Sequence, residues 1–135
     1  MISQNLKIYI DQDQHEFYDR LTQRSGENPD DHPFQTMKDL FMVAACLGAK
    51  HNRFQEIKKP RDIFSSSVFD QKVDIPVLVS IAYGHEQKFE ILMDENVMVW
   101  IVQGYACGGF DIIKEKLLQS PGRLLDNMIT MILNF

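Results

Sequence analysis

The sequence has little cysteine and no long run of apolar residues. Cys46 and Cys107 are its two cysteines, and both lie among small or apolar neighbours, far from each other and from any histidine cluster. This spacing indicates neither a zinc site nor a disulfide framework, so we expect two reduced and largely buried thiols. No apolar run approaches the ~20 residues that a membrane span needs, and residues 1–10 lack the charged and apolar regions of a signal peptide. We therefore expect a cytoplasmic protein that does not enter a membrane.

Positive charge is also scarce. The chain has 14 Lys and Arg residues against 19 Asp and Glu residues, a formal net charge of −5. This balance argues against a protein that coats DNA or a membrane by bulk charge. A content of 44% apolar and 24% charged residues is typical of a soluble globular protein. Residues 1–135 are expected to form a single domain with one hydrophobic core.

Most of the sequence carries helix signals. Thr36 and Asp94 each precede an apolar helical pattern and can cap it. Residues 74–84 are ambiguous, because β-branched side chains favour a buried strand whereas an acidic cap, an early proline and a final glycine favour a helix; we predict a helix. Alternation over residues 6–10 predicts a short strand. The predicted fold is mainly α, a compact single-domain helical bundle with one or two short β-strands and about six helices, over residues 13–24, 37–47, 74–84, 94–105, 110–119 and 121–132.

Glycine and proline set several of the predicted helix ends. Gly48 follows an apolar helix and predicts a left-handed stop. Gly108 and Gly109 predict a sharp turn between two helices, with a positive φ at one of them. Ser120 and Pro121 are typical of an N-cap followed by the first helical residue, so the last helix is expected to begin there.

Two segments predict irregular structure. Residues 25–33 concentrate glycine, proline and aspartate and are expected to form a surface loop. Residues 62–70 place three serines between Phe64 and Phe69, which indicates an irregular segment held at both ends by buried aromatic side chains. A nucleophilic serine in this segment would need a partnering base that the sequence does not identify.

Positive charge is concentrated in residues 50–61, which we call the basic connection. It holds five basic residues and one acidic residue, a local charge of +4, so the rest of the chain sums to −9. One interpretation is a solvated loop or edge strand whose lysines discourage strand pairing. The other is a phosphate-facing patch, in which Phe54 could stack on a base if it lies outside the core. The candidate nucleic-acid-binding residues are Lys50, Arg53, Lys58, Lys59 and Arg61.

Patterns for catalysis or metal binding are sparse. Asp74 followed by Glu86 and Lys88 has the order of acid and Glu-x-Lys found in magnesium-dependent nucleases. Such a site needs both carboxylates on adjacent strand ends, whereas the predicted helix separates them. We expect no catalytic residue, no metal and no cofactor. The four histidines include no pair at metal-ligand spacing; they are His15, His32, His51 and His85.

Several segments together resemble a known family. They are residues 34–48 (FQTMKDLFMVAACLG), the basic connection, residues 62–64 (DIF), residues 81–82 (IA) and residues 105–110 (YACGGF). In this order, over about residues 8–118, they are similar to the DNA phosphorothioation-associated (dnd system-associated) protein 4 family. The resemblance implies a bacterial cytoplasmic protein encoded with machinery that replaces a backbone phosphate oxygen of DNA by sulfur, or that restricts DNA lacking that mark. It implies no catalytic residues.

Three functions remain open. The leading hypothesis is a non-enzymatic accessory or interaction subunit of a bacterial DNA phosphorothioation system, acting in modification or restriction and so in phage defence. Its partners would be other proteins of that system or a second copy of itself, contacted through apolar side chains such as Trp100, Phe110 or those of the last helix. The second hypothesis is a nucleic-acid-binding protein that contacts DNA through the basic connection. The third and weaker one is a magnesium-dependent nuclease.

Overall fold

The structure is a computed structural model that describes residues 2–3, 5–22 and 32–134. Within these residues the fold is mainly helical, as predicted, with one two-stranded antiparallel sheet. The predicted loop over residues 25–33 lies outside the described residues except for its last two positions, as do the last two residues of the first predicted helix. The elements in chain order are β1 (Lys7–Asp11), α1 (Gln12–Leu21), α2 (Met37–Lys50), β2 (Pro60–Ser65), the short helix η2 (Ser66–Val68), α3 (Asp74–Glu86), the short helix η3 (Phe89–Met93), α4 (Glu95–Ile113), the π-helical turn η4 (Lys114–Leu118) and α5 (Leu124–Leu133).

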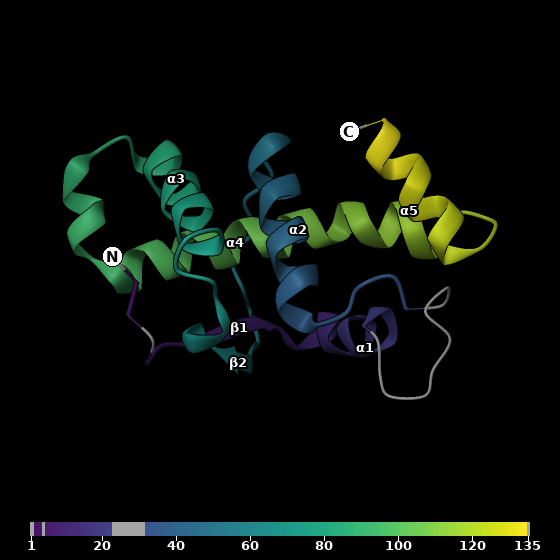
Figure 1. Ribbon diagram of the computed structural model, residues 1–135, viewed down its shortest axis with the longest axis horizontal. Coiled ribbons are helices and arrows are strands. Elements are labelled where there is room, and N and C mark those ends of the chain that lie inside the picture. The colour runs from purple at the N-terminus through teal and green to yellow at the C-terminus, as the bar shows by residue number, and fades with distance from the viewer. Residues whose placement is uncertain (1, 4, 23–31, 135) are drawn as a thin grey trace.

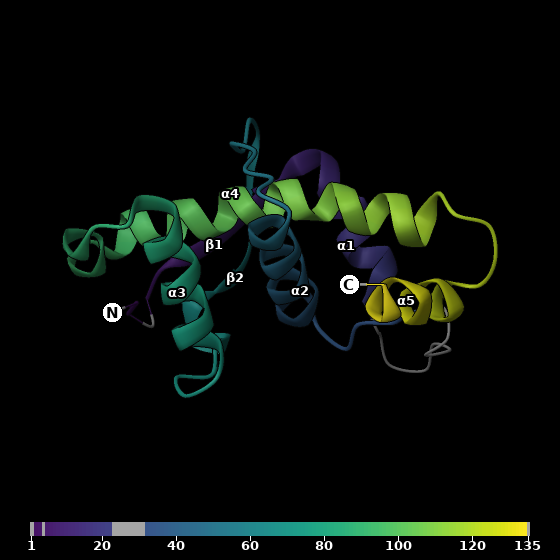
Figure 2. The same cartoon turned by 90° about the horizontal axis from the view of Figure 1, so that it is seen from above.

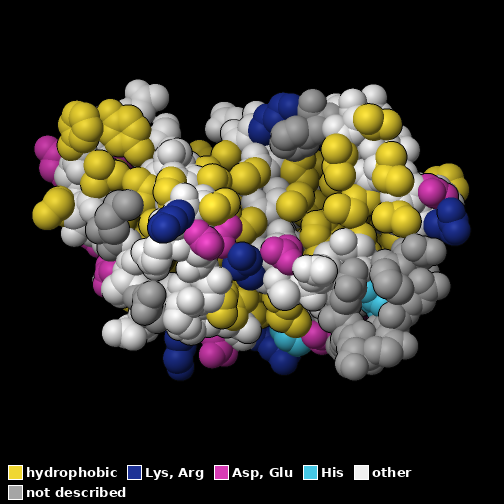
Figure 3. Space-filling model, in the orientation of Figure 1, with side chains coloured by type: hydrophobic (Ala, Val, Ile, Leu, Met, Phe, Trp, Pro, Cys, Tyr) yellow, Lys and Arg dark blue, Asp and Glu magenta, His cyan; other side chains and the backbone are white. Residues whose placement is uncertain are grey.

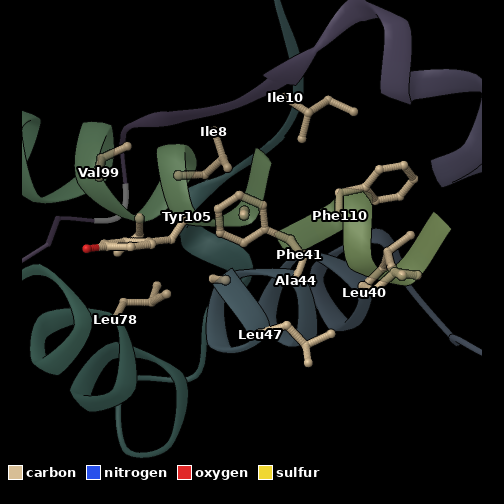
Figure 4. Close-up of a cluster of buried hydrophobic side chains, with 14 of the residues drawn as sticks. Ile8, Ile10, Leu40, Phe41, Ala44, Leu47, Leu78, Val99, Tyr105 and Phe110 are labelled. Carbon is tan, nitrogen blue, oxygen red and sulfur yellow. The ribbon is translucent and has the colours of Figure 1, made fainter. Parts of the chain in front are cut away.

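Helix α4 is the element against which the rest of the chain is arranged. Figure 1 shows it running along the length of the molecule, with α3, α2 and α5 set across it in that order and β1 and α1 beneath it. The same arrangement is seen from above in Figure 2. One cluster of buried hydrophobic side chains joins these elements (Figure 4). Its fully buried members include Ile8, Leu40, Phe41, Ala44, Leu78 and Phe110.

The predicted N-terminal strand and the cap of α2 are confirmed. Strand β1 pairs with β2, with Ile8 opposite Phe64 and Ile10 opposite Arg61. The Thr36 side chain accepts a hydrogen bond from the backbone N–H of Asp39 at 3.2 Å, as an N-cap residue does. The prediction for residues 62–70 was wrong at its start, because those residues continue strand β2 as far as Ser65.

The ambiguous segment at residues 74–84 is a helix, as predicted. Helix α3 covers Asp74–Glu86, and its left-handed terminal residue is Gln87, with φ 57°, so Gly84 does not end it. Asp74 does not cap its own helix. Its carboxylate accepts hydrogen bonds from Lys38 Nζ at 2.8 Å and from the backbone N–H of Asp70 at 2.8 Å, and these bonds fix the start of α3 against α2.

The predicted helix break at Gly108 and Gly109 was wrong. Helix α4 runs without interruption through both glycines to Ile113, and neither has a positive φ. The two helices predicted on either side of them are therefore one long helix. The predicted stop at Gly48 was also wrong, because α2 continues to Lys50.

These glycines allow two helices to cross at close range. A methyl group on Gly109 would overlap the carbonyl oxygen of Ala44, and one on Gly48 would overlap the carbonyl oxygen of Tyr105. The backbones of α2 and α4 therefore lie in direct contact where they cross. Glycine costs about 1 kcal/mol relative to alanine in a helix interior, and here its lack of a side chain is what the packing requires.

The start of the last helix was predicted three residues too early. Helix α5 begins at Leu124, with Arg123 as its N-cap residue. The Ser120 hydroxyl instead donates to the carbonyl oxygen of Glu115 at 3.0 Å, and Gly122 adopts φ 105°. Ser120 and Pro121 thus belong to the turn that precedes α5.

Among the described residues, no helix has the length and hydropathy to cross a bilayer.

Two glycine substitutions test whether the close crossing of α2 and α4 requires glycine. We expect Gly109→Ala to lower the free energy of unfolding by about 1–3 kcal/mol, because a buried methyl group must displace helix backbone. Gly84→Ala is the matched control. It lies in an exposed stretch of α3 with open space around it, so alanine should raise stability by up to about 1 kcal/mol. Urea unfolding of both variants measures the difference, and a Gly109→Ala variant as stable as the parent would contradict the crossing.

Candidate functional site

The basic connection lies directly on the glycine face of α4. The backbone N–H of Arg53 donates to the carbonyl oxygen of Gly48 at 2.8 Å, and that of Gln55 donates to the carbonyl oxygen of Gly104 at 3.0 Å. A methyl group on Gly108 would overlap the carbonyl oxygen of Arg53, and one on Gly104 would overlap the ring of Phe54. In Figure 2 the connection between α2 and β2 protrudes on the side of α4 that faces away from α3 and α5. The connection is therefore a fixed part of the fold.

A buried carboxylate holds the far end of the connection. The side chain belongs to Asp11, which is 7% exposed. One of its carboxylate oxygens accepts a hydrogen bond from the backbone N–H of Asp13 at 3.1 Å and so caps α1. The other oxygen accepts a hydrogen bond from the backbone N–H of Lys58 at 3.1 Å. The backbone N–H of Gln12 donates to the carbonyl oxygen of Lys59 at 2.8 Å. The cap of α1 is thus Asp11, so the helix begins one residue before the predicted start at residue 13. The same side chain fixes the backbone that carries two lysines.

All five predicted nucleic-acid-binding side chains are exposed. They fall into two groups along the connection. The first group lies at the end of α2 and the crossing with α4, and the second lies beside the start of α1 and in the first residues of β2. The groups are Lys50 and Arg53, and Lys58, Lys59 and Arg61.

The aromatic residue of the basic connection, Phe54, packs against other rings of the fold. The ring of Phe54 is stacked on the His85 ring, with centroids 5.0 Å apart, and meets Tyr105 edge-on at 5.3 Å. His85 is in turn 2.8 Å from the hydroxyl of Tyr105 through its Nδ1. Phe54 therefore fills the space above Gly104 and joins the connection to α3 and α4, with its ring partly buried against the core.

Phe54 and two other aromatic side chains line an open cavity. The cavity holds about 180 Å³ between β1, the basic connection and α4. Trp100, which is 45% exposed, and Tyr9 form part of its wall. Sequence reasoning did not assign Tyr9 or Gln103 to any site, although the alternation of Ile8, Tyr9 and Ile10 already placed the tyrosine on the outer face of the strand. The lining residues are Tyr9, Phe54, Glu56, Ile57, Pro60, Trp100, Gln103 and Gly104.

A second surface is apolar and lies between α2 and α5. Figure 3 shows hydrophobic side chains gathered over α5 and the neighbouring side of α2. A groove of about 300 Å³ there is lined by Met42, Val43, Cys46, Leu47, Met131 and Ile132. The outer side chains of α5 are open to solvent, with Ile129 49%, Ile132 57% and Leu133 79% exposed. Of the apolar residues predicted to form a partner surface, Phe110 is fully buried and belongs to the core.

The residues of the nuclease pattern do not come together. Asp74 is bound to Lys38 and to the backbone of Asp70, and Glu86 ends the same helix, about 18 Å away at 1.5 Å per residue. In the part of the chain that the structure describes, no three His, Cys, Asp or Glu side chains are grouped so that they could hold a metal ion.

The two thiols differ in burial. Cys107 is buried, as predicted, whereas Cys46 is half-buried. Burial, together with the negative charges of Asp11 and Asp111, raises the pKa of the Cys107 thiol to about 11. Burial also raises the pKa of Cys46. Both thiols are therefore protonated at neutral pH, which is the unreactive form of cysteine.

Comparison with known proteins identifies a family. The family model described as DNA sulphur modification system-associated protein 4 matches residues 7–135, which is nearly the whole chain. No curated protein and no solved structure matches.

Proposed function

Because the chain belongs to the DNA sulphur modification system-associated protein 4 family, we propose that it is a non-enzymatic accessory subunit of a bacterial DNA phosphorothioation system. It works in the cytoplasm by contacting other proteins of that system. The association with sulphur modification comes from the family, and the accessory role is proposed from the surfaces of the molecule.

The observation that carries the accessory role is the exposed apolar face of α5. Monomeric soluble proteins rarely leave large contiguous apolar patches in water, and such patches mark protein contacts. Here Ile129, Ile132 and Leu133 lie beside the apolar groove between α2 and α5. Their burial against a partner would contribute about 25 cal/mol for each Å² of apolar surface removed from water. A protein of the same system is the partner that this face is proposed to bind.

Nucleic-acid binding is the second candidate function. It is supported by the exposure of all five basic side chains on a backbone that α4 and Asp11 hold in place. A fixed backbone lowers the conformational entropy that binding costs. Lys58 and Lys59 are adjacent and exposed, so they are the residues most suited to contact phosphate groups.

Co-purification tests the accessory role. The chain is co-expressed with the other proteins of its phosphorothioation system, and we expect it to elute with at least one of them in size-exclusion chromatography. The double substitution Ile132→Asp and Leu133→Asp should abolish this complex while the chain stays folded, because both side chains are mostly exposed. The control is Phe89→Asp with Met93→Asp, which changes two still more exposed apolar residues in η3 and should leave the complex intact. If the α5 variant co-elutes as the parent does, α5 is not the contact surface.

Charge reversal tests the second candidate. Duplex DNA binding should weaken with salt at a slope near −0.9 for each phosphate contact, and a patch of this size makes about three contacts. Lys58→Glu with Lys59→Glu should remove most of the affinity and change stability by less than ~0.5 kcal/mol for each exposed substitution. Lys72→Glu with Lys88→Glu makes the same change in net charge at the two ends of α3 and serves as the control. Equal affinity and salt slope in the parent and the Lys58–Lys59 variant would show that the basic connection is only a solvated segment.

A further inference from the structure

The cavity beside the basic connection has the size of one planar ring system. Its volume of about 180 Å³ equals roughly six water molecules at about 30 Å³ each. That volume admits a single heterocyclic base but not a whole nucleotide. It lies at the surface between β1, the connection and α4, so a base could enter it while its sugar and phosphate stay outside.

Three aromatic side chains, Tyr9, Phe54 and Trp100, form part of its wall. Ile8 and Ile10 are buried in the core, so the alternation of β1 turns Tyr9 towards the cavity. Trp100 is 45% exposed, although most of α4 is buried. An indole left in water on an otherwise buried helix is a suitable stacking surface, because stacking of a base on an aromatic side chain contributes about 1–3 kcal/mol.

A buried amide supplies a donor inside the cavity. Gln103 is 9% exposed, and its Oε1 accepts a hydrogen bond from the backbone N–H of Tyr9 at 2.8 Å. That bond orients the amide so that Nε2 is the remaining donor, and no other described residue accepts from it. The edge of a nucleobase carries carbonyl and ring-nitrogen acceptors that match such a donor, and the Glu56 carboxylate, also in the lining, can accept from an exocyclic amino group.

Two exposed lysines lie next to the cavity lining in the chain. Lys58 and Lys59 are exposed and lie in the chain between the lining residues Ile57 and Pro60. The backbone of both lysines therefore runs along the edge of the cavity lining. With the one negative charge of Glu56, residues 56–60 carry a local charge of +1.

From this juxtaposition we infer that the cavity binds a single unpaired nucleobase, stacked against Trp100 and Tyr9 and hydrogen-bonded to Gln103, with its phosphate at Lys58 and Lys59. The inference rests on the second candidate function and deepens it. The same chemistry is offered by a base in single-stranded DNA and by a free nucleotide.

Trp100 is the single tryptophan of the chain, so its fluorescence reports on the cavity. The probes are an eight-nucleotide single-stranded DNA, an oligonucleotide of the same length without bases, and deoxycytidine monophosphate. We expect the base-carrying DNA to quench Trp100. The abasic strand should leave the fluorescence unchanged and bind at least about fivefold more weakly, the factor that corresponds to the lower end of the stacking energy.

Substitution of Trp100 gives a second readout. With a fluorescently labelled single strand, Trp100→Leu should lower the affinity at least about fivefold. Trp100→Phe keeps an aromatic surface and should retain most of the affinity, so the inference stays testable if the leucine variant does not fold. Phe89→Leu changes another exposed aromatic residue outside the cavity lining and should bind as the parent does.

The outcomes separate this inference from the proposed function. Quenching by the monophosphate but not by the strand would support the base site with a free nucleotide as its ligand. Equal binding of the abasic strand, or unchanged affinity in Trp100→Leu, would overturn the base site while leaving phosphate contacts by the basic connection intact. The base site would also be overturned if neither the base-carrying strand nor the monophosphate bound. The accessory role is decided by co-purification and is unaffected by these results.

Discussion

The close crossing of α2 over α4 is the contact on which the other features depend. Gly48 and Gly109 bring the two backbones together beside Ala44 and Tyr105. Because the helices touch at the C-terminal half of α2, the chain that leaves α2 emerges directly on α4, where Gly104 and Gly108 leave room for it. Larger residues at these positions would hold the connection away from α4 and would separate it from Trp100 and Gln103. The position of five basic side chains thus depends on four glycines.

The crossing also separates two surfaces of different character. The connection protrudes on the side of α4 facing away from α3 and α5 (Figure 2), whereas the apolar groove lies between α2 and α5 (Figure 3). Under the proposed function the apolar surface contacts a protein of the DNA phosphorothioation system, and under the second candidate function the basic connection contacts nucleic acid. A small protein with two such surfaces can hold DNA near a partner without performing chemistry itself.

Sequence reasoning predicted features that are encoded locally. The cap at Thr36, the helix at residues 74–84, the strand at residues 6–10 and the charge of the basic connection depend on neighbouring residues. Gly108 and Gly109 could not be interpreted in this way, because a glycine needed for a helix end and one needed for a close helix contact look the same until the opposing helix is known. The base-sized cavity is likewise formed by residues from β1, the connection and α4, so its composition is visible only in the folded chain.

The central claim, that the basic connection is held on α4 as a fixed structure, is tested most directly by amide hydrogen exchange resolved residue by residue. The amides of Arg53 and Gln55 are bonded to Gly48 and Gly104, whereas those of Phe54 and Glu56 make no hydrogen bond with any described residue. The account predicts slow exchange at Arg53 and Gln55, approaching the rates of α4 itself, and fast exchange at Phe54 and Glu56. Exchange of Arg53 and Gln55 at the rate of an unstructured peptide would contradict it.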